Sequence, residues 1–193
     1  MLRKLYDWVM RLAAHRLAGL WLFIISFIES SFFPIPPHAM VIPMVLSDRA
    51  RAFRYWVLVT VGSVLGGLFG YLIGYALFDA VGAPVLAFYG AEEKFEAFKE
   101  SYNAYGAWIV FTFGVTPFPY KVVTIASGAT GLNLAVFTLT SLVARGLIFG
   151  VIIALLYFFG RPIKSFIEKR LGLLTFLFVG LVAGGFVALK FLL

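Results

Sequence analysis

The chain alternates long apolar runs with short charged segments. One run of 24 residues without a charge covers 55–78, and two further apolar runs cover 134–160 and 171–193. Because about 20 mainly apolar residues are needed to cross the hydrocarbon core of a bilayer, each run predicts a transmembrane helix. In residues 1–16, basic and apolar side chains alternate at helical spacing, which predicts an amphipathic helix lying in the membrane interface.

Two other apolar stretches, 17–46 and 105–132, are each interrupted by a proline cluster. Proline lacks a backbone N–H and disfavours helix in the residue before it. Each stretch therefore predicts a helical hairpin whose arms are too short to span a bilayer. The second cluster lies 83 residues after the first, which indicates an internal repeat. The breaks contain Pro34, Pro36 and Pro37 in the first stretch and Pro117 and Pro119 in the second.

The charged segments orient these elements. Residues 1–16 and 47–54 carry net charges of +3 and +2, residues 79–105 carry −3, and residues 161–170 carry +3. Since cytoplasmic loops are enriched in Lys and Arg, the N-terminus is predicted to be cytoplasmic, and the first hairpin enters and leaves the membrane on that side. The acidic segment is predicted to lie outside, with an amphipathic helix over 91–105, so the second hairpin enters from the opposite side.

Together these patterns predict an all-α integral membrane protein with a single membrane domain over 1–193. The predicted fold is an inverted repeat of two re-entrant helical hairpins, each followed by a transmembrane helix. An N-terminal interfacial helix and a C-terminal transmembrane helix complete it. Inverted repeats with broken helices are typical of secondary transporters, in which the substrate site lies where the breaks meet.

The composition narrows the possible chemistry. Of the 193 residues, 62% are hydrophobic and 13% are charged, and the chain has no cysteine, two histidines and nine carboxylates. Disulfides and cysteine metal sites are therefore excluded, and we expect neither an enzyme active site, nor a metal, nor a cofactor. The net charge of +7 is concentrated in short segments between the apolar runs, which favours contact with lipid headgroups over a nucleic-acid partner.

The predicted helix over 55–78 carries a glycine at every fourth position. Residues at this spacing share one face of a helix, and small residues in a membrane helix let another backbone approach closely. The stripe therefore predicts tight packing against a hairpin arm, with a substrate-lining role as the alternative. It consists of Gly62, Gly66, Gly70 and Gly74.

Four ionisable residues fall inside the predicted membrane segments: Glu29, His38, Lys121 and Arg145. Arg145 lies about 16 Å into its helix, near the bilayer centre, where a charge costs ~2.5–3.5 kcal/mol. Glu29 precedes the first break and Lys121 follows the second. If the breaks meet, either an ion pair locks the halves together, or a polar cavity with surplus positive charge and one protonatable acid accepts an anionic headgroup. His38 is either a polar helix end or a ligand contact.

Three short motifs point to a known family. The first is Glu-Ser-Ser-Phe-Phe-Pro-Ile-Pro-Pro-His at 29–38, and the second is Gly66-x4-Tyr71-x2-Gly74. The third begins at Tyr105-Gly106, includes Thr116-Pro117 and ends at Ser127-Gly128-Ala129. Over about 28–150 the chain resembles the DedA family, the bacterial branch of the VTT-domain (SNARE-associated Golgi) proteins, and it is most similar to a YqaA-like branch. The first motif resembles E-N-x-x-P-P-I-P-S-E of that family, and Glu29 matches its first hairpin acid.

The chain departs from the family pattern at three positions. The family's second acid falls on His38. The arginines of its R-F-x-P-x-x-R pattern fall on Gly114 and Tyr120, so that only Lys121 and Arg145 could replace them.

The resemblance implies a multi-pass, lipid-handling protein of the bacterial plasma (inner) membrane, since family members are linked to polyprenyl-phosphate translocation, phospholipid scrambling and membrane homeostasis. The leading hypothesis is a transporter or flippase for an anionic lipid, either polyprenyl phosphate or a phospholipid. Glu29, Lys121, Arg145 and His38 are its candidate substrate or proton-coupling residues. The alternative is a proton-coupled small-solute or ion transporter. Membrane lipids and a second copy of the chain, forming a homo-oligomer, are the candidate partners.

Overall fold

The computed structural model describes residues 12–13, 15–33, 35–116 and 119–160, and all regular elements within them are helical. The interfacial helix predicted over 1–16 lies mostly outside the described residues, and the C-terminal helix predicted over 171–193 lies entirely outside them. The elements are α2 (Ala18–Ser31), α3 (His38–Ser47), η1 (Arg49–Arg51), α4 (Ala52–Leu77), η2 (Phe78–Gly82), α5 (Ala83–Tyr89), α6 (Glu92–Val115), α7 (Tyr120–Ala129) and α8 (Leu134–Phe159).

Two helical stretches of the described chain, 49–89 and 134–159, are long and apolar enough to cross a membrane. The second is α8. Its N-cap is Asn133, whose side chain accepts hydrogen bonds from the backbone N–H groups of Ala135 and Val136. The first consists of η1, α4, the short π-helical segment η2, and α5 in succession. It ends at Gly90, whose φ of +59° favours glycine. The first stretch includes the span predicted over 55–78, and the second ends one residue before the end of the span predicted over 134–160.

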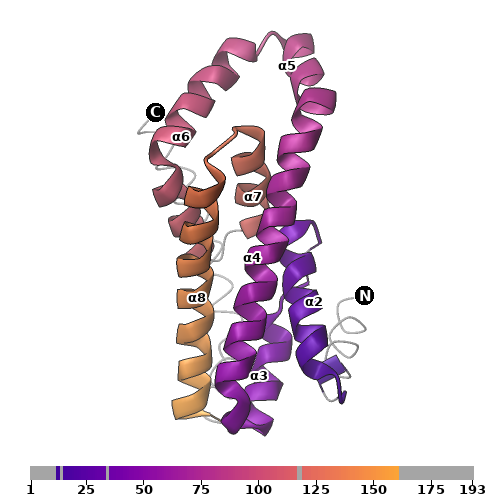
Figure 1. Ribbon diagram of the computed structural model, residues 1–193, viewed down its shortest axis with the longest axis vertical. Coiled ribbons are helices and arrows are strands. Elements are labelled where there is room, and N and C mark those ends of the chain that lie inside the picture. Colours follow the sequence, from indigo (N-terminus) through magenta and orange to yellow (C-terminus); the bar gives the residue numbers. More distant parts are fainter. Residues whose placement is uncertain (1–11, 14, 34, 117–118, 161–193) are drawn as a thin grey trace, which may run out of the picture.

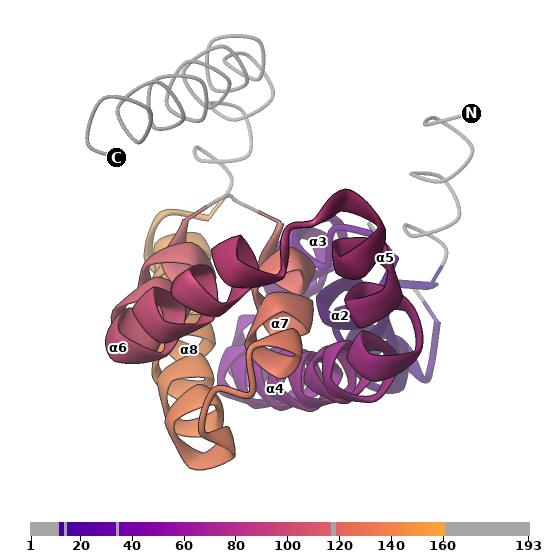
Figure 2. The same ribbon diagram turned by 90° about the horizontal axis from the view of Figure 1, so that it is seen from above.

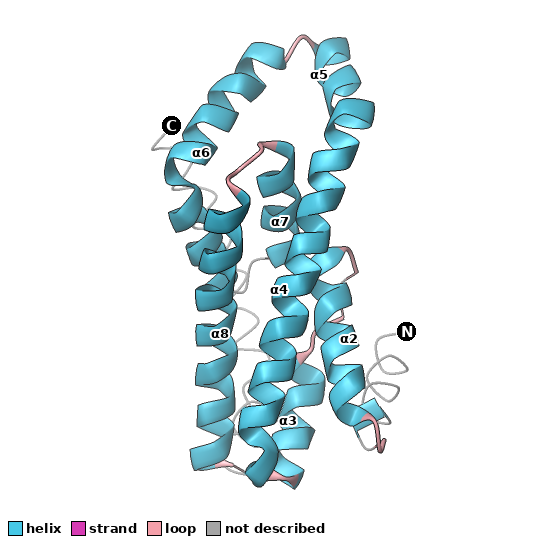
Figure 3. Ribbon diagram, viewed as in Figure 1, coloured by secondary structure: helices cyan, strands magenta, loops and turns pink. Residues whose placement is uncertain are grey.

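Helix breaks occur at both proline clusters. Between α2 and α3 the chain leaves the helix at Ser31 and re-enters it at His38, and between α6 and α7 it does so from Val115 to Tyr120. Both breaks lie beside the middle part of α4 (Figure 1). The outer ends of α2 and α3 lie toward the start of α4, whereas those of α6 and α7 lie toward its far end (Figures 1 and 3).

The helix predicted over 91–105 continues without interruption into the first arm of the second hairpin, so that α6 is one helix of 24 residues. Separate elements were expected there. The helix continues because its buried positions, Tyr102, Gly106, Val110 and Gly114, recur at every fourth residue and keep one packed face throughout. Gly106 costs about 1 kcal/mol of helix propensity, but it lets Leu132 pack directly against the helix.

The glycine stripe of α4 is divided between the two hairpins. Gly62 and Gly66 lie against the backbone of α2, and a Cβ added at Gly66 would collide with the Phe27 carbonyl. Gly70 and Gly74 lie against α7. The view down the long axis shows α7 between α2 and α8, alongside α4 (Figure 2). Helix α4 is therefore the common support of α2 and α7.

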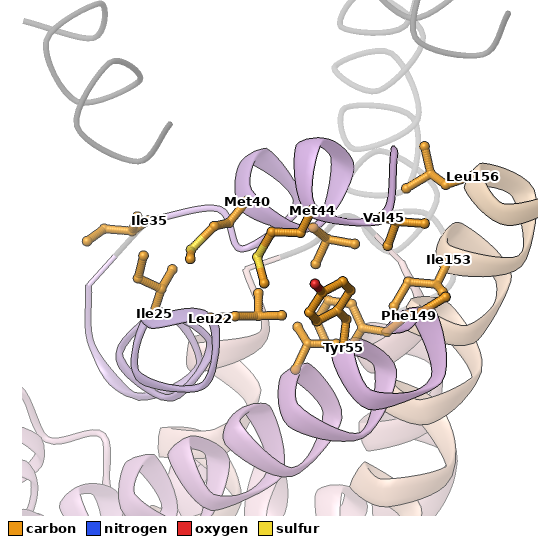
Figure 4. Close-up of a cluster of buried hydrophobic side chains, with 13 residues drawn as sticks. Leu22, Ile25, Ile35, Met40, Met44, Val45, Tyr55, Phe149, Ile153 and Leu156 are labelled. Carbon is orange, nitrogen blue, oxygen red and sulfur yellow. The ribbon is translucent and has the colours of Figure 1, made fainter. Parts of the chain in front are cut away.

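Two apolar clusters fill the interior at different heights along α4 and α8. The first joins α2, α3, the start of α4 and the end of α8 around Met40, Tyr55 and Phe149 (Figure 4). The second joins α4, α6, α7 and the start of α8 around Tyr71 and Phe137. The residues of α4 and α8 that lie between the two clusters include the buried polar residues Ser63, Ser141 and Arg145.

Candidate functional site

Arg145, in the middle of α8, is the centre of the buried polar region. Its side chain is only 7% exposed. Its Nε–H donates a hydrogen bond of 2.6 Å to Ser63 Oγ on α4, and its Nη2–H donates one of 3.2 Å to the Glu29 carboxylate on α2. Charge-assisted bonds of this type are about twice as strong as neutral ones. One guanidinium therefore links α8 to α4 and to the last turn of α2.

Two aromatic rings hold the same guanidinium. The Cζ atom of Arg145 lies 4.7 Å from the ring centroid of Tyr120, the first residue of α7, and 4.7 Å from that of Phe149 on α8. Cation–π contacts of this kind are stronger where water is excluded. The Tyr120 hydroxyl donates a hydrogen bond to Ser141 on α8. The second hairpin thus contacts Arg145 through a ring, whereas the first contacts it through a carboxylate.

Two serines form a second connection between Arg145 and Glu29. The Ser30 hydroxyl donates to Glu29 Oε2 at 3.2 Å and lies 2.7 Å from the Ser63 hydroxyl. Because each hydroxyl has one proton, Ser63 donates to Ser30 and accepts from Arg145. The guanidinium, both hydroxyls and the carboxylate form a closed ring of hydrogen bonds, which couples the positions of its members.

Part of the ion pair has no hydrogen-bond partner within the described residues. Glu29 Oε1 and Arg145 Nη1 have no hydrogen-bond partner within the described residues, and the Glu29 side chain is 18% exposed. Nη1 carries two N–H donors. A planar guanidinium with an unused edge is suited to the oxygens of a phosphate or carboxylate.

The structure joins the two breaks but leaves Lys121 outside the ion pair. Thr124 Oγ1 on α7 lies 3.3 Å from the Ser30 carbonyl on α2 and 2.9 Å from the Lys121 carbonyl. The half-buried Lys121 ammonium makes no ion pair with any described residue. Of the two cations that the sequence offers to Glu29, the structure pairs it with Arg145.

His38 lies beside this region without bonding to the ion pair. It begins α3, is half-buried, and its ring centroid is 5.4 Å from that of Phe149, the ring that also contacts Arg145. Pro36, Pro37 and Pro119 lie in the two breaks. The predicted break residues Pro34 and Pro117 fall outside the described residues.

Sequence reasoning missed four side chains that contact or support Arg145. Ser141 and Phe149 lie four residues before and after Arg145, on the same face of α8. Helical spacing from Arg145 could therefore have found both. Tyr120 stood out only as a position where an arginine was expected. Ser63 had no signal beyond its place in the glycine-rich part of α4. The four are Ser63, Tyr120, Ser141 and Phe149.

The fold and the buried polar site define a helical membrane protein with two broken-helix hairpins. The family model of the VTT domain matches residues 7–160, so the chain belongs to the VTT-domain (DedA) family, as its motifs predicted. A protein of Haemophilus influenzae described as uncharacterized is 31% identical over 186 residues, which cover 96% of both chains. A protein of Histophilus somni, described as an uncharacterized homologue, is 33% identical over 141 residues, or 73% of both chains. No solved structure matches the chain.

Proposed function

We propose that the chain is a transporter that moves an anionic lipid between the leaflets of the bacterial plasma membrane. The observation that carries the proposal is the Arg145–Glu29 pair. It is held between two helix breaks, with N–H donors of Arg145 and one carboxylate oxygen of Glu29 left without partners in the described residues. Ionisable residues inside membrane segments are rare and costly, and they typically mark substrate or ion pathways and proton relays.

In this proposal both hairpins are re-entrant and enter the membrane from opposite sides. Helix α2 has 14 residues and α3 has 10, or about 21 Å and 15 Å, against a hydrocarbon core of about 30 Å. The basic segments 1–16 and 47–54 then face the cytoplasm. Because the chain has no cysteine, Arg16→Cys and Ala50→Cys can be labelled singly with an impermeant maleimide. Labelling from opposite sides would contradict this topology.

The proposed binding step exchanges one anion for another at Arg145. A phosphate headgroup takes the unused N–H groups of the guanidinium, and Lys121, without an ionic partner in the described chain, supplies a second cation. The headgroup then competes with the Glu29 carboxylate for the guanidinium, and Glu29 is the residue proposed to couple this exchange to protons. Release of the headgroup returns the carboxylate to Arg145.

The surroundings of the first break favour a lipid over a small polar solute. Phe32 and Phe33, which directly follow α2, are 56% and 50% exposed, and they lie within a few residues of Glu29. A substrate that passes this point meets aromatic surface next to one charged site. That combination suits a phosphate headgroup attached to a hydrocarbon chain.

The test is reconstitution of the full chain in liposomes with labelled polyprenyl phosphate or labelled phosphatidylcholine, followed by measurement of leaflet exchange. We expect faster exchange of the anionic lipid only. Glu29→Gln keeps the shape of the side chain and an oxygen that can accept from Arg145, so the melting temperature should fall much less than in Arg145→Ala, while the dependence of exchange on pH is lost. Glu93→Gln, an exposed acid on α6, is the matched control.

Three outcomes would overturn the proposal. If Glu29→Gln exchanges lipid normally at every pH, the carboxylate is not the coupling group. If stability and exchange fall together in Glu29→Gln and are both restored by exchanging the charges of residues 29 and 145, the pair serves to hold the helices. If neither lipid is exchanged but an imposed pH gradient drives a small solute or ion, the alternative class of transporter is correct.

A further inference from the structure

A second candidate site begins at the end of the molecule where α4 begins and α8 ends, and none of its lining residues belongs to the Arg145–Glu29 pair. An open groove of about 430 Å³ runs there between the two helices. Its lining includes Arg49, Phe53, Trp56, Ala154 and Tyr157. It therefore combines one cation with an otherwise apolar and aromatic surface.

The floor of this groove is fixed by a hydrogen bond. The half-buried Trp56 on α4 donates its indole N–H to the Gly146 carbonyl on α8 at 2.8 Å. Its ring lies across α8 because Gly150, whose Cβ would meet the indole nitrogen at 3.2 Å, has no side chain. The indole is therefore a built part of the surface and is not a freely rotating side chain.

The cation of the groove is also positioned. The Arg49 guanidinium packs against Gly160, the residue that ends α8 with a φ of +53°. The C-terminal end of a helix attracts positive charge. Neighbouring Arg51 is engaged by Asp48 at 3.0 Å, whereas Arg49 has no ion pair with any described residue. Arg49 thus offers a fixed positive charge at the mouth of the groove.

The groove continues into a second apolar groove of about 520 Å³ that extends along α8 toward Leu142. The two share Trp56, Gly150 and Ala154. From Leu142 to Phe158 the distance along α8 is about 24 Å, which exceeds the ~15 Å thickness of one leaflet's hydrocarbon region. A single acyl chain has room to lie along it.

We propose that this surface binds one anionic phospholipid of the membrane, with the phosphate on Arg49 and an acyl chain along α8 over Trp56. Arg49 lies at one end of the groove, where its charge matches the phosphate of the headgroup. The apolar surface beyond it matches the acyl chain. The site shares no residue with the Arg145–Glu29 pair. It therefore stands or falls independently of the proposed transport.

The test measures lipid binding to the purified full chain by native mass spectrometry, with phosphatidylglycerol and phosphatidylcholine as probes. We expect Arg49→Gln to weaken phosphatidylglycerol binding about fivefold, the effect of one cation near an anionic headgroup, and to leave phosphatidylcholine unchanged. Arg51→Gln and Arg54→Gln remove the same charge outside the groove and should have little effect. Ala154→Trp, which fills the shared part of both grooves, should weaken both lipids. Leu155→Trp, exposed but outside the lining, should not.

Several results would overturn this site. Equal losses in all three arginine variants would mean that the phospholipid senses only the net charge of the segment. Unchanged binding in Ala154→Trp would mean that no acyl chain lies in the groove. A disulfide-linked dimer formed by Ala154→Cys in membranes would assign the groove to a second copy of the chain. Because the Arg49 and Ala154 variants are judged separately, misfolding of one leaves the other as a test.

Discussion

The first hairpin, α2 with α3, and the second, α6 with α7, each present one helix to the glycine face of α4. Gly66 meets the backbone of α2, and Gly74 meets the backbone of α7. In the second case the closeness is mutual, because Gly128 of α7 lies against the Tyr71 carbonyl of α4. The two halves are thus alike in bringing backbone close to α4, the first hairpin through its first arm, α2, and the second through its second arm, α7.

The side chains that the two hairpins bring to α8 are different in kind. From α2 comes the carboxylate of Glu29, bonded to Arg145, and from α7 comes the ring of Tyr120, which contacts the same guanidinium. A competing anion can displace a carboxylate from a guanidinium, whereas an aromatic ring carries no charge that the anion could replace. The comparison indicates that the two hairpins share a packing role and that the exchangeable bond belongs to the first.

The positions at which the chain departs from the family pattern surround Arg145. Gly114 faces the side chain of Ala144, Tyr120 lies under the guanidinium, and His38 packs on Phe149. The family pattern has arginines at the positions of Gly114 and Tyr120 on the second hairpin. In this chain the cation next to these two positions is Arg145 on α8. Glycine at 114 also leaves the space in which α6 packs against α8.

The largest effect is expected from Arg145→Ala, which removes a group that bonds to Glu29 of the first hairpin and contacts Tyr120 of the second. It leaves Glu29 partly buried without its cation, so the free energy of unfolding should fall by about 3–5 kcal/mol. The double variant Glu29→Leu with Arg145→Met should be much more stable than Arg145→Ala, because no charge is left unpaired. Chemical unfolding in detergent measures both. A parent-like curve for Arg145→Ala would show that the pair does not hold the hairpins together.

The backbone similarity of the halves predicts similar costs for a methyl group on either side of α4. Gly66→Ala and Gly74→Ala should each lower stability by about 1–3 kcal/mol, since the added Cβ meets backbone that cannot move aside. Gly146→Ala is the control, because its nearest neighbour would be 3.7 Å away. Thermal unfolding of the three variants compares the halves directly. If only one of the first two is destabilised, the two hairpins are not packed alike.

Helix positions could be predicted from the sequence because they depend on local features. The length of an apolar run decides whether a helix can span the membrane, and proline clusters decide where helices break. Helices α4 and α8 and both breaks therefore fall close to their predicted positions. The continuity of α6 was missed because it depends on tertiary packing at Tyr102 and Val110. No propensity around Gly106 signals it.

The partner of Glu29 could not be chosen from the sequence, because the choice depends on the rotation of α7. Adjacent residues on a helix point about 100° apart, so turning Tyr120 toward α8 turns Lys121 away from it. The tyrosine faces inward because its hydroxyl finds Ser141 and its ring finds Arg145. These contacts come from a helix that follows α7 in the chain, and they are invisible in the local pattern.

The smallest effect on stability is expected at the remaining cation of the second hairpin. Because Lys121 is half-buried and bonds to no described acid, Lys121→Gln should change the free energy of unfolding by no more than about 0.5 kcal/mol. The exchange rate of an anionic lipid should nevertheless fall, since the proposed binding step uses Lys121 as the second cation for the headgroup. Lys121→Arg, which keeps the charge, should retain the rate. A loss of stability in Lys121→Gln comparable to that of Arg145→Ala would mean that both hairpins are held by ion pairs, and the asymmetry between them would disappear.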